Sequence, residues 1–184
     1  TSEISVISLG GIVVNRTLRI AGDELNENII QYARNNFNML IGERTAEDIK
    51  IRIGSAHEST EHLEAPVRGR DLVTGLPKEV IMSGSQAREA MQKSVATIVE
   101  AVRQCIEETP PELLSDIIEQ GIYLAGGGAL LRGLADVITD TTHIRTHIAD
   151  DPLTAVVRGT GIVLEDIEAV QEVLLPSVHG SELK

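Results

Sequence analysis

Strand patterns stand near both ends of this chain and enclose a middle section that reads mainly as helix. Residues 3–9 and 12–20 are β-branched runs separated by Gly10-Gly11, a strong signal for an antiparallel hairpin. Two more short strand patterns, at 122–125 and 143–149, lie among helical patterns late in the sequence. Strands interleaved with helices indicate an α/β fold in which helices flank a mixed sheet.

The middle section has the features of a smaller α+β subdomain. Thr45 followed by Asp48 resembles a capping box that would begin a helix, and Pro66 favours an edge strand. The expected elements here are helices at 25–40 and 45–54, a loop at 55–62 and a hairpin over 63–83. We therefore expect a subdomain at 22–90 inserted into a sheet domain made of 1–21 and 91–184.

The second half alternates helix and strand. The longest helical pattern, 86–108, ends at Thr109-Pro110-Pro111, and Pro111 suits the first turn of a helix that reaches Gln120 before Gly121 stops it. Two more helices are expected, at 130–138 and from Asp150-Asp151-Pro152 to about 170.

The composition narrows the possible partners. With 16 Lys+Arg against 28 Asp+Glu, the 184-residue chain carries a formal charge of −12, which argues against binding to nucleic-acid phosphates or to anionic lipid. No apolar run approaches the roughly 18 residues that a membrane helix needs. The single cysteine, Cys105, excludes an internal disulfide, as is typical of a reducing cytoplasm.

The most suggestive motif is the glycine run in Leu124-Ala125-Gly126-Gly127-Gly128-Ala129-Leu130-Leu131. Between a strand and a helix, glycines let the backbone approach a ligand closely, and a helix N-terminus offers free N–H groups to a phosphate. The run lacks both the dinucleotide fingerprint and the P-loop pattern. A tightly packed turn explains it equally well, so the motif alone leaves a nucleotide site and a structural corner open.

Glu47 and Lys50 form a second candidate pair. Their i, i+3 spacing places a carboxylate and an ammonium on one face of the predicted helix. There they could hold a ribose hydroxyl and the edge of a base, although a solvated salt pair is the competing interpretation.

Neither the histidines nor the cysteine indicates a metal site or a nucleophile. His143 and His147 are four residues apart in a predicted strand, so about 13 Å would separate them. Cys105 lies beside an apolar helical stripe, which favours packing in the core. We predict no metal ligands and no catalytic residues in this chain.

Together these pieces resemble one family, the MreB family of bacterial actin homologues, also called rod shape-determining proteins. The resemblance covers the chain to about residue 168 and implies an actin-like ATPase fold, related to ribonuclease H, in which two lobes close over ATP and Mg²⁺. This chain would be the C-terminal lobe. The similar segments, in the family's order, are TSEISVISLGGIVV, RIAGDELNENII, IGERTAEDIKIRIGSA, RGRDLVTGLPKEV, TPPELLSDIIEQGI, LAGGGALLRGL and DPLTAVVRGTG.

The resemblance also implies roles for individual residues. The family's adenosine motif matches Gly126, Gly127, Gly128, Ala129 and Leu130; Glu47 and Lys50 match the helix that contacts ribose and adenine; Thr1 matches the last residue of a D-x-G-G-G-T phosphate loop. The rest of that loop and the family's catalytic acid have no counterpart in this sequence. We therefore expect nucleotide contacts but no ATPase activity from this chain alone.

For function, the resemblance implies half of an ATP-binding protein that forms filaments and maintains rod shape by organising cell-wall synthesis. Expected partners are other copies of the protein and the cell-wall synthesis machinery, without nucleic acid and without direct membrane contact from this half. The expected location is cytoplasmic, as membrane-associated filaments. Two alternatives remain: another ATPase of this fold, of the sugar kinase or chaperone type, and an interaction module that needs no nucleotide.

The start of the sequence raises one further expectation. It has no initiator Met and opens directly in a strand pattern, so we expect a piece of a longer protein. In the actin-like lobe, the strand before the phosphate loop lies in the centre of the sheet. Without that strand, central backbone groups would stay unpaired, and the isolated chain would be marginally stable or would borrow a strand.

Overall fold

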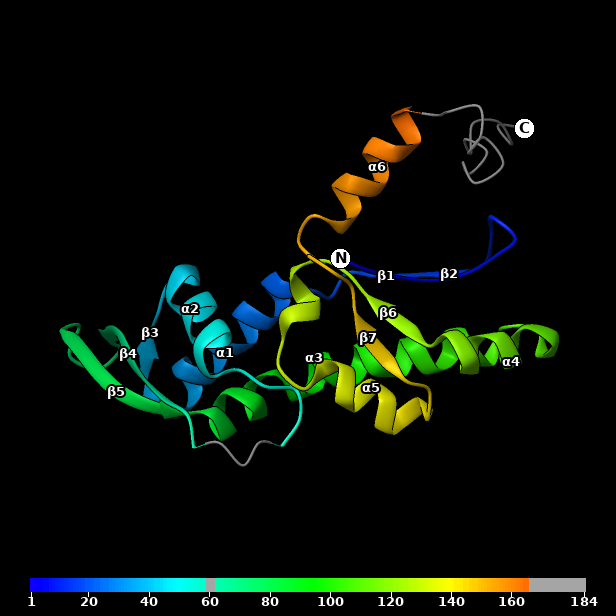
Figure 1. Cartoon of the computed structure of the whole chain (residues 1–184). Helices are drawn as coiled ribbons and strands as arrows, with labels where there is room; N and C mark the ends of the chain where they lie inside the picture. Colours follow the sequence, from blue (N-terminus) through cyan, green and yellow to red (C-terminus); the bar gives the residue numbers. More distant parts are fainter. Residues whose placement is uncertain (59–61, 166–184) are drawn as a thin grey trace, which may run out of the picture.

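One long helix, α3 (Gly84–Glu107), forms the axis of the molecule (Figure 1). The computed structural model describes residues 1–58 and 62–165. The inserted section packs on one end of α3, and the N-terminal hairpin and the later strands lie toward its other end (Figure 1). Within the described ranges, no helix combines the length and the apolar character needed to cross a membrane.

Helix α3 confirms the predicted helix and owes its position to an apolar stripe. Ala87, Met91 and Val95 lie on its buried face, as do Val99 and Val102 nearer its C-terminal end. Residues three and four apart share one side of a helix, so the stripe faces the core continuously.

The start of α3 is fixed by a capping box that the sequence analysis did not identify. The Ser83 hydroxyl accepts a hydrogen bond from the Gln86 amide (3.3 Å), and the Gln86 side chain accepts one from the Ser83 amide (2.9 Å). Both bonds satisfy N–H groups that a helix start otherwise leaves unpaired. Because β5 ends at Ser83, the chain passes from strand to helix without a connecting loop.

The inserted section forms two helices and a three-stranded antiparallel sheet in the order β3-β4-β5. Its core is aliphatic and closed, since Ile29, Met39, Ile49, Val67 and Met82 are almost completely buried. Its elements are α1 (Gly22–Phe37), β3 (Met39–Leu40), α2 (Glu43–Ile53), β4 (Glu64–Asp71) and β5 (Pro77–Ser83).

Three details of the insertion differ from the prediction. Helix α1 ends before Met39 because Asn38 adopts the left-handed conformation (φ 49°) and turns the chain into β3. Thr45 is not a cap: α2 begins at Glu43, after Gly42, which makes no side-chain cap. Strand β4 is the central strand of the sheet and not an edge strand. However, β3 pairs only with the last two residues of β4, so Pro66 is paired on the β5 side alone.

The N-terminal hairpin consists of β1 (Ser2–Ser8) and β2 (Gly11–Leu18) in antiparallel register. Its turn is Leu9-Gly10, both with positive φ (50° and 77°), one residue earlier than the predicted Gly10-Gly11. A register shift between Val6 and Ile7 marks a β-bulge, which the alternating pattern of the sequence does not reveal.

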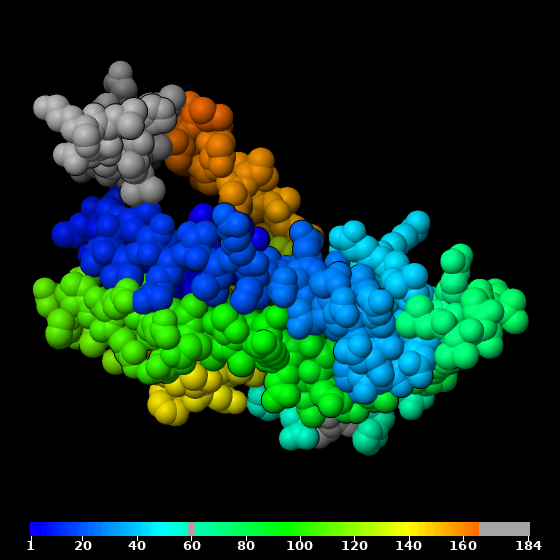
Figure 2. All heavy atoms as spheres, turned by 180° about the vertical axis from the view of Figure 1, so that it is seen from behind, coloured from blue at the N-terminus to red at the C-terminus, as the bar shows by residue number. Residues whose placement is uncertain are grey.

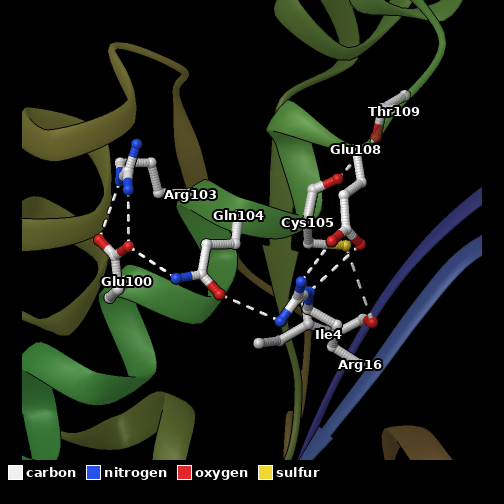
Figure 3. Close-up of polar contacts among 8 residues, drawn as sticks. All are labelled: Ile4, Arg16, Glu100, Arg103, Gln104, Cys105, Glu108 and Thr109. Atoms are coloured by element: carbon white, nitrogen blue, oxygen red, sulfur yellow. Dashed lines mark hydrogen bonds and ion pairs between the residues drawn. The ribbon is translucent and has the colours of Figure 1, made fainter.

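A row of polar side chains fastens β2 to α3 (Figure 3). The Arg16 guanidinium donates to Gln104 Oε1 (3.0 Å) and forms an ion pair with Glu108. On the same helix, Arg103 donates to Glu100 (2.8 Å) and holds the pKa of that carboxyl down at about 2. Both strands of the hairpin also pack against α3. Helix α3 therefore covers one face of the hairpin.

The remaining strands form a separate pair. Strand β6 (Ile122–Leu124) runs parallel to β7 (Thr146–Ile148), and within the described residues this pair shares no ladder with β1–β2. The expected mixed sheet is therefore present as two unconnected parts. Tyr123, in the middle of β6, is exposed.

The helices around this second pair are shorter and less covered. Neither α4 (Pro111–Gln120) nor α6 (Ala155–Glu165) contains a buried residue, and α6 stands away from the body of the molecule (Figures 1 and 2). Helix α5 (Leu134–Thr142) starts four residues later than predicted. Helix α6 starts three residues after Pro152, and its predicted extension to about 170 lies outside the described residues.

Candidate functional site

The glycine run lies directly after β6 and is folded into a short 3₁₀ turn. Gly126 has a φ of 83°, and residues Gly127–Leu130 form the turn, closed by hydrogen bonds from Ala129 to Gly126 (3.2 Å) and from Leu131 to Gly128 (3.1 Å). The prediction of a helix starting at Leu130 is wrong, because this turn intervenes. Gly126 therefore precedes the turn, Gly127 and Gly128 lie within it, and none of the three stands at the N-terminus of an α-helix.

One side of this glycine loop is open. A Cβ added at Gly126 or Gly128 would meet no heavy atom within 4 Å. The opposite side is anchored: Ala129 and Leu131 are buried, and the Gly126 amide donates to the Pro152 carbonyl (2.7 Å). The loop thus presents bare backbone on its open side, where a ligand can approach closely.

Glu47 and Lys50 lie on α2 as predicted but do not pair with each other. Glu47 is exposed. Lys50 is half-buried, and its Nζ donates to the Gly22 carbonyl at the start of α1 (3.0 Å). The other face of α2 is held in the core by Ala46, Ile49 and Ile53. The simple salt-pair interpretation is therefore wrong, and the carboxylate of Glu47 remains available at the surface.

Arg132 brings the glycine loop and α2 together. Its guanidinium donates to the carbonyls of Ile51 (3.2 Å) and Arg52 (2.7 Å) in the last turn of α2. Its own carbonyl accepts from the Ala56 amide (2.7 Å) and from the Ser55 hydroxyl (3.2 Å). Because Arg132 follows the loop by two residues, the two elements singled out in the sequence meet at one corner of the fold.

Thr1 is exposed at the start of β1, and in the described part of the chain its side chain makes no hydrogen bond to the other candidate residues. The structure therefore joins the loop and α2, but it does not tie Thr1 to them.

A cavity of about 500 Å³ lies elsewhere, where the start of α3 meets the segment after α2. Its lining includes His57, Glu58 and Arg88, and none of the candidate residues contributes to it. Segments distant in sequence build it, so no local motif could have indicated it.

The surroundings of His143, His147 and Cys105 indicate structural and not catalytic roles. His143 ends α5 with a φ of 59° and is not in a strand, so the strand-spacing argument used for it does not apply. His147 stacks on Tyr123 with ring centroids 5.2 Å apart. Burial raises the pKa of the Cys105 thiol, which favours the unreactive protonated form. Among residues 1–58 and 62–165, no three His, Cys, Asp or Glu side chains gather as a metal site would require.

Comparison with known proteins supports the resemblance seen in the motifs. Residues 1–172 match the family model for MreB/Mbl protein. The cell shape-determining protein MreB of Escherichia coli (strain K12) is 45% identical over 183 residues, covering 100% of this chain and 50% of the relative. The cell shape-determining protein Mbl of Bacillus subtilis (strain 168) is 41% identical over 168 residues, covering 91% of this chain and 50% of the relative.

A solved structure shows the same fold. The crystal structure of MreB5 of Spiroplasma citri bound to ADP matches with a TM-score of 0.87 at 38% identity, covering 92% of this chain and 52% of that one. The predicted actin-like α/β fold is thereby confirmed. This chain spans about half the length of the curated relatives it matches. On these matches, the chain belongs to the MreB/Mbl family.

Proposed function

We propose that this chain grips the nucleoside side of ATP or ADP within a filament-forming protein that determines cell shape. The observation that carries the proposal is the corner at which Arg132 joins the open glycine loop to α2. The proposed contacts are Thr1, Glu47, Lys50, Gly126, Gly127, Gly128, Ala129 and Leu130. The family relative solved with ADP supports the choice of ligand.

The residues at this corner suit a nucleoside. The bare backbone at Gly126 and Gly128 leaves room for a flat ring or a sugar to lie against the chain. The exposed Glu47 carboxylate can accept hydrogen bonds from ribose hydroxyls. Lys50 would fix the start of α1 through the Gly22 carbonyl, so its ammonium acts partly within the protein.

Magnesium does not fit the described residues by themselves, because they contain no group of three candidate ligands. Transfer of the γ-phosphoryl group needs metal, donors and a water-orienting group that converge on one phosphate. We expect phosphate release by this chain to stay at the level of buffer, and turnover above that level would contradict this.

Titration of a fluorescent ADP analogue into the purified chain tests the proposal. A hydrogen bond to a charged group contributes about 1.5–3 kcal/mol, so Glu47→Ala should weaken binding roughly tenfold to a hundredfold. The matched control is Asp48→Ala, which removes the neighbouring exposed carboxylate, paired with Arg52. Equal affinity of Glu47→Ala and the unmutated chain would reject the role of Glu47.

The same titration separates the competing functions. An interaction module would show no saturable ADP binding by the unmutated chain. A sugar kinase would need a catalytic aspartate that faces a sugar pocket, and we identify no candidate for it. Binding that depends on Glu47 but not on Asp48 favours the filament protein.

Self-association is the second part of the proposal, and two exposed apolar surfaces support it. The hairpin tip, defined as Leu72, Val73 and Leu76, presents three exposed side chains between β4 and β5. Helix α4 carries an uncovered apolar face that includes Ile118. The tip and α4 lie at opposite ends of the molecule in both views (Figures 1 and 2).

Surfaces at opposite ends favour a head-to-tail contact between copies. Such a contact repeats without closing and produces a filament, whereas a two-fold contact would stop at a dimer. Two hydrogen bonds brace the tip, because Asp71 Oδ1 accepts from the amides of Val73 and Thr74, both at 2.9 Å.

Sedimentation of assembled protein tests the tip. Val73→Asp should abolish assembly, since it places a charge in an apolar contact. Leu9→Asp is the control, because Leu9 is an even more exposed apolar residue in the turn of the other hairpin. Loss of assembly in both variants, or in neither, would contradict a specific role of the tip.

In the cell, we propose that such filaments lie in the cytoplasm at the inner membrane and organise the cell-wall synthesis machinery. The relatives are named cell shape-determining proteins, which supports a role in cell shape. Complementation of rod shape by a full-length protein with and without Val73→Asp would test it, and normal rods with the variant would contradict it.

A further inference from the structure

Arg132 contacts the end of α2 with both its side chain and its backbone. The guanidinium spans the carbonyls of Ile51 and Arg52, while the backbone carbonyl receives the Ala56 amide and the Ser55 hydroxyl. Ser55 and Arg132 also form an isolated parallel β-bridge. A single residue thus holds the last turn of α2 and the segment that follows it.

These contacts satisfy groups that a helix end leaves unpaired. The last carbonyls of an α-helix have no partner within the helix, and they carry the negative end of its dipole. In α2, the Gly54 amide pairs with the Lys50 carbonyl (3.0 Å). Arg132 brings a positive charge to the next two carbonyls, and both hydrogen bonds come from its Nη2 nitrogen.

The position of Arg132 in the sequence gives this cap a second consequence. Leu131, the residue before it, is buried and closes the glycine loop through its hydrogen bond to Gly128. Glu47 lies one turn before Ile51 on α2 and therefore on the same side of the helix. A rotation or fraying of α2 would move Glu47 relative to the loop unless Arg132 prevented it.

We propose that Arg132 is a positioning residue for the nucleotide: it sets the distance between the glycine loop and Glu47 and does not need to touch the ligand. This inference rests on the proposed nucleotide-binding function. It goes beyond that function because it assigns the geometry of the site to a residue outside the set of proposed contacts.

Two measurements on the purified chain test the proposal. Without ligand, Arg132→Ala should speed amide hydrogen exchange in peptides covering residues 43–56, because the last turn of α2 loses its cap. With the fluorescent ADP analogue, the same variant should bind about threefold to thirtyfold more weakly, the usual range of energetic coupling between linked sites. Arg132→Lys keeps the charge and a single donor nitrogen on a shorter side chain, so it should restore part of both effects.

Arg34→Ala is the control. Arg34 is an exposed arginine on α1, and no hydrogen bond or ion pair of its side chain occurs among the described residues. This variant should bind like the unmutated chain.

A double-mutant cycle separates positioning from general loss of stability. If Arg132 acts by placing Glu47, Arg132→Ala should weaken binding much less when Glu47→Ala is already present. Independent effects, or an Arg132→Ala chain that binds like the unmutated one, would overturn the proposal.

A different set of results is expected if the proposed nucleotide-binding function itself is wrong. The unmutated chain would then not bind the analogue, and the positioning role would fall with it. Changed exchange in Arg132→Ala would still show that Arg132 caps α2 for structural reasons only.

Discussion

The inserted section and the region around α4 and α6 contain similar apolar patterns but bury them very differently. Ile29, Ile49 and Met82 in the insertion are at most 1% exposed, whereas Ile118 on α4 is 64% exposed and Val156 on α6 is 71% exposed. The insertion closes its core within itself and against α3. The second region leaves apolar side chains uncovered within the described residues.

The contrast shows that an amphipathic pattern predicts which face of a helix can be buried. It does not predict whether another element covers that face. Both α3 and α4 have apolar residues at helical spacing. Helix α3 lies between the insertion and the N-terminal hairpin and is covered by both, while α4 has no such cover.

Truncation of one buried and one exposed isoleucine should give the largest difference. Ile49→Ala leaves a cavity in the closed core and should lower the free energy of unfolding by about 2–5 kcal/mol. Ile118→Ala should change it by less than about 0.5 kcal/mol, as is usual for surface positions. Urea unfolding measures both, and similar losses for the two variants would show that α4 is packed in solution.

Removal of the cap on α3 should have a smaller effect. Ser83→Ala removes the side-chain acceptor for the Gln86 amide and should lower the free energy of unfolding by about 1 kcal/mol. Ser85→Ala, two residues later, is the matched control, since among the described residues its hydroxyl hydrogen-bonds that of Ser83 and no backbone amide. An unchanged stability of Ser83→Ala would mean that packing of the insertion alone fixes the start of the helix.

Acidification should give the smallest and most local effect. The Thr74 amide, the Lys78 ammonium (3.0 Å) and the Val73 amide hold the pKa of Asp71 well below its ordinary value of 3.8. Because the pKa is lower in the folded state, the stabilising contribution is present above the unfolded-state value and is lost as the pH falls further.

Amide chemical shifts of Val73 and Thr74 should therefore stay constant down to about pH 4 and change only well below it. Asp71→Asn should remove most of this pH dependence. A tip that keeps its shifts at low pH in the unmutated chain would show that the carboxylate does not hold it.

Long periodic elements could be predicted from the sequence with good boundaries. The apolar stripe of α3 and the alternating residues of β1 and β2 repeat often enough that a single exception does not hide the pattern. The hairpin turn was nevertheless placed one residue late, because Leu9 adopts a positive φ that glycine would take more easily. Likewise, Thr45-Asp48 has the spacing of a capping box, but α2 had already begun at Glu43.

The candidate site could be predicted only in part. The glycine run and Glu47 were found because their residue types carry a local signal. Arg132 carries no such local signal in the sequence. Its role depends on the fold, which brings the end of α2 within hydrogen-bonding distance of its guanidinium. Contacts between segments about 80 residues apart depend on tertiary structure, which residue spacing does not encode.

The direct passage from β5 into α3 has a mechanical consequence. Helix α3 has 24 residues and no proline, and its only glycine is the first residue, so it has no evident point of bending. At 1.5 Å per residue it is a rod of about 36 Å. The expected subdomain boundary at residue 90 falls inside this rod. A force applied to the tip would therefore tilt α3 as a rigid body, together with the strands packed at its other end. The molecule would not bend at a hinge within α3.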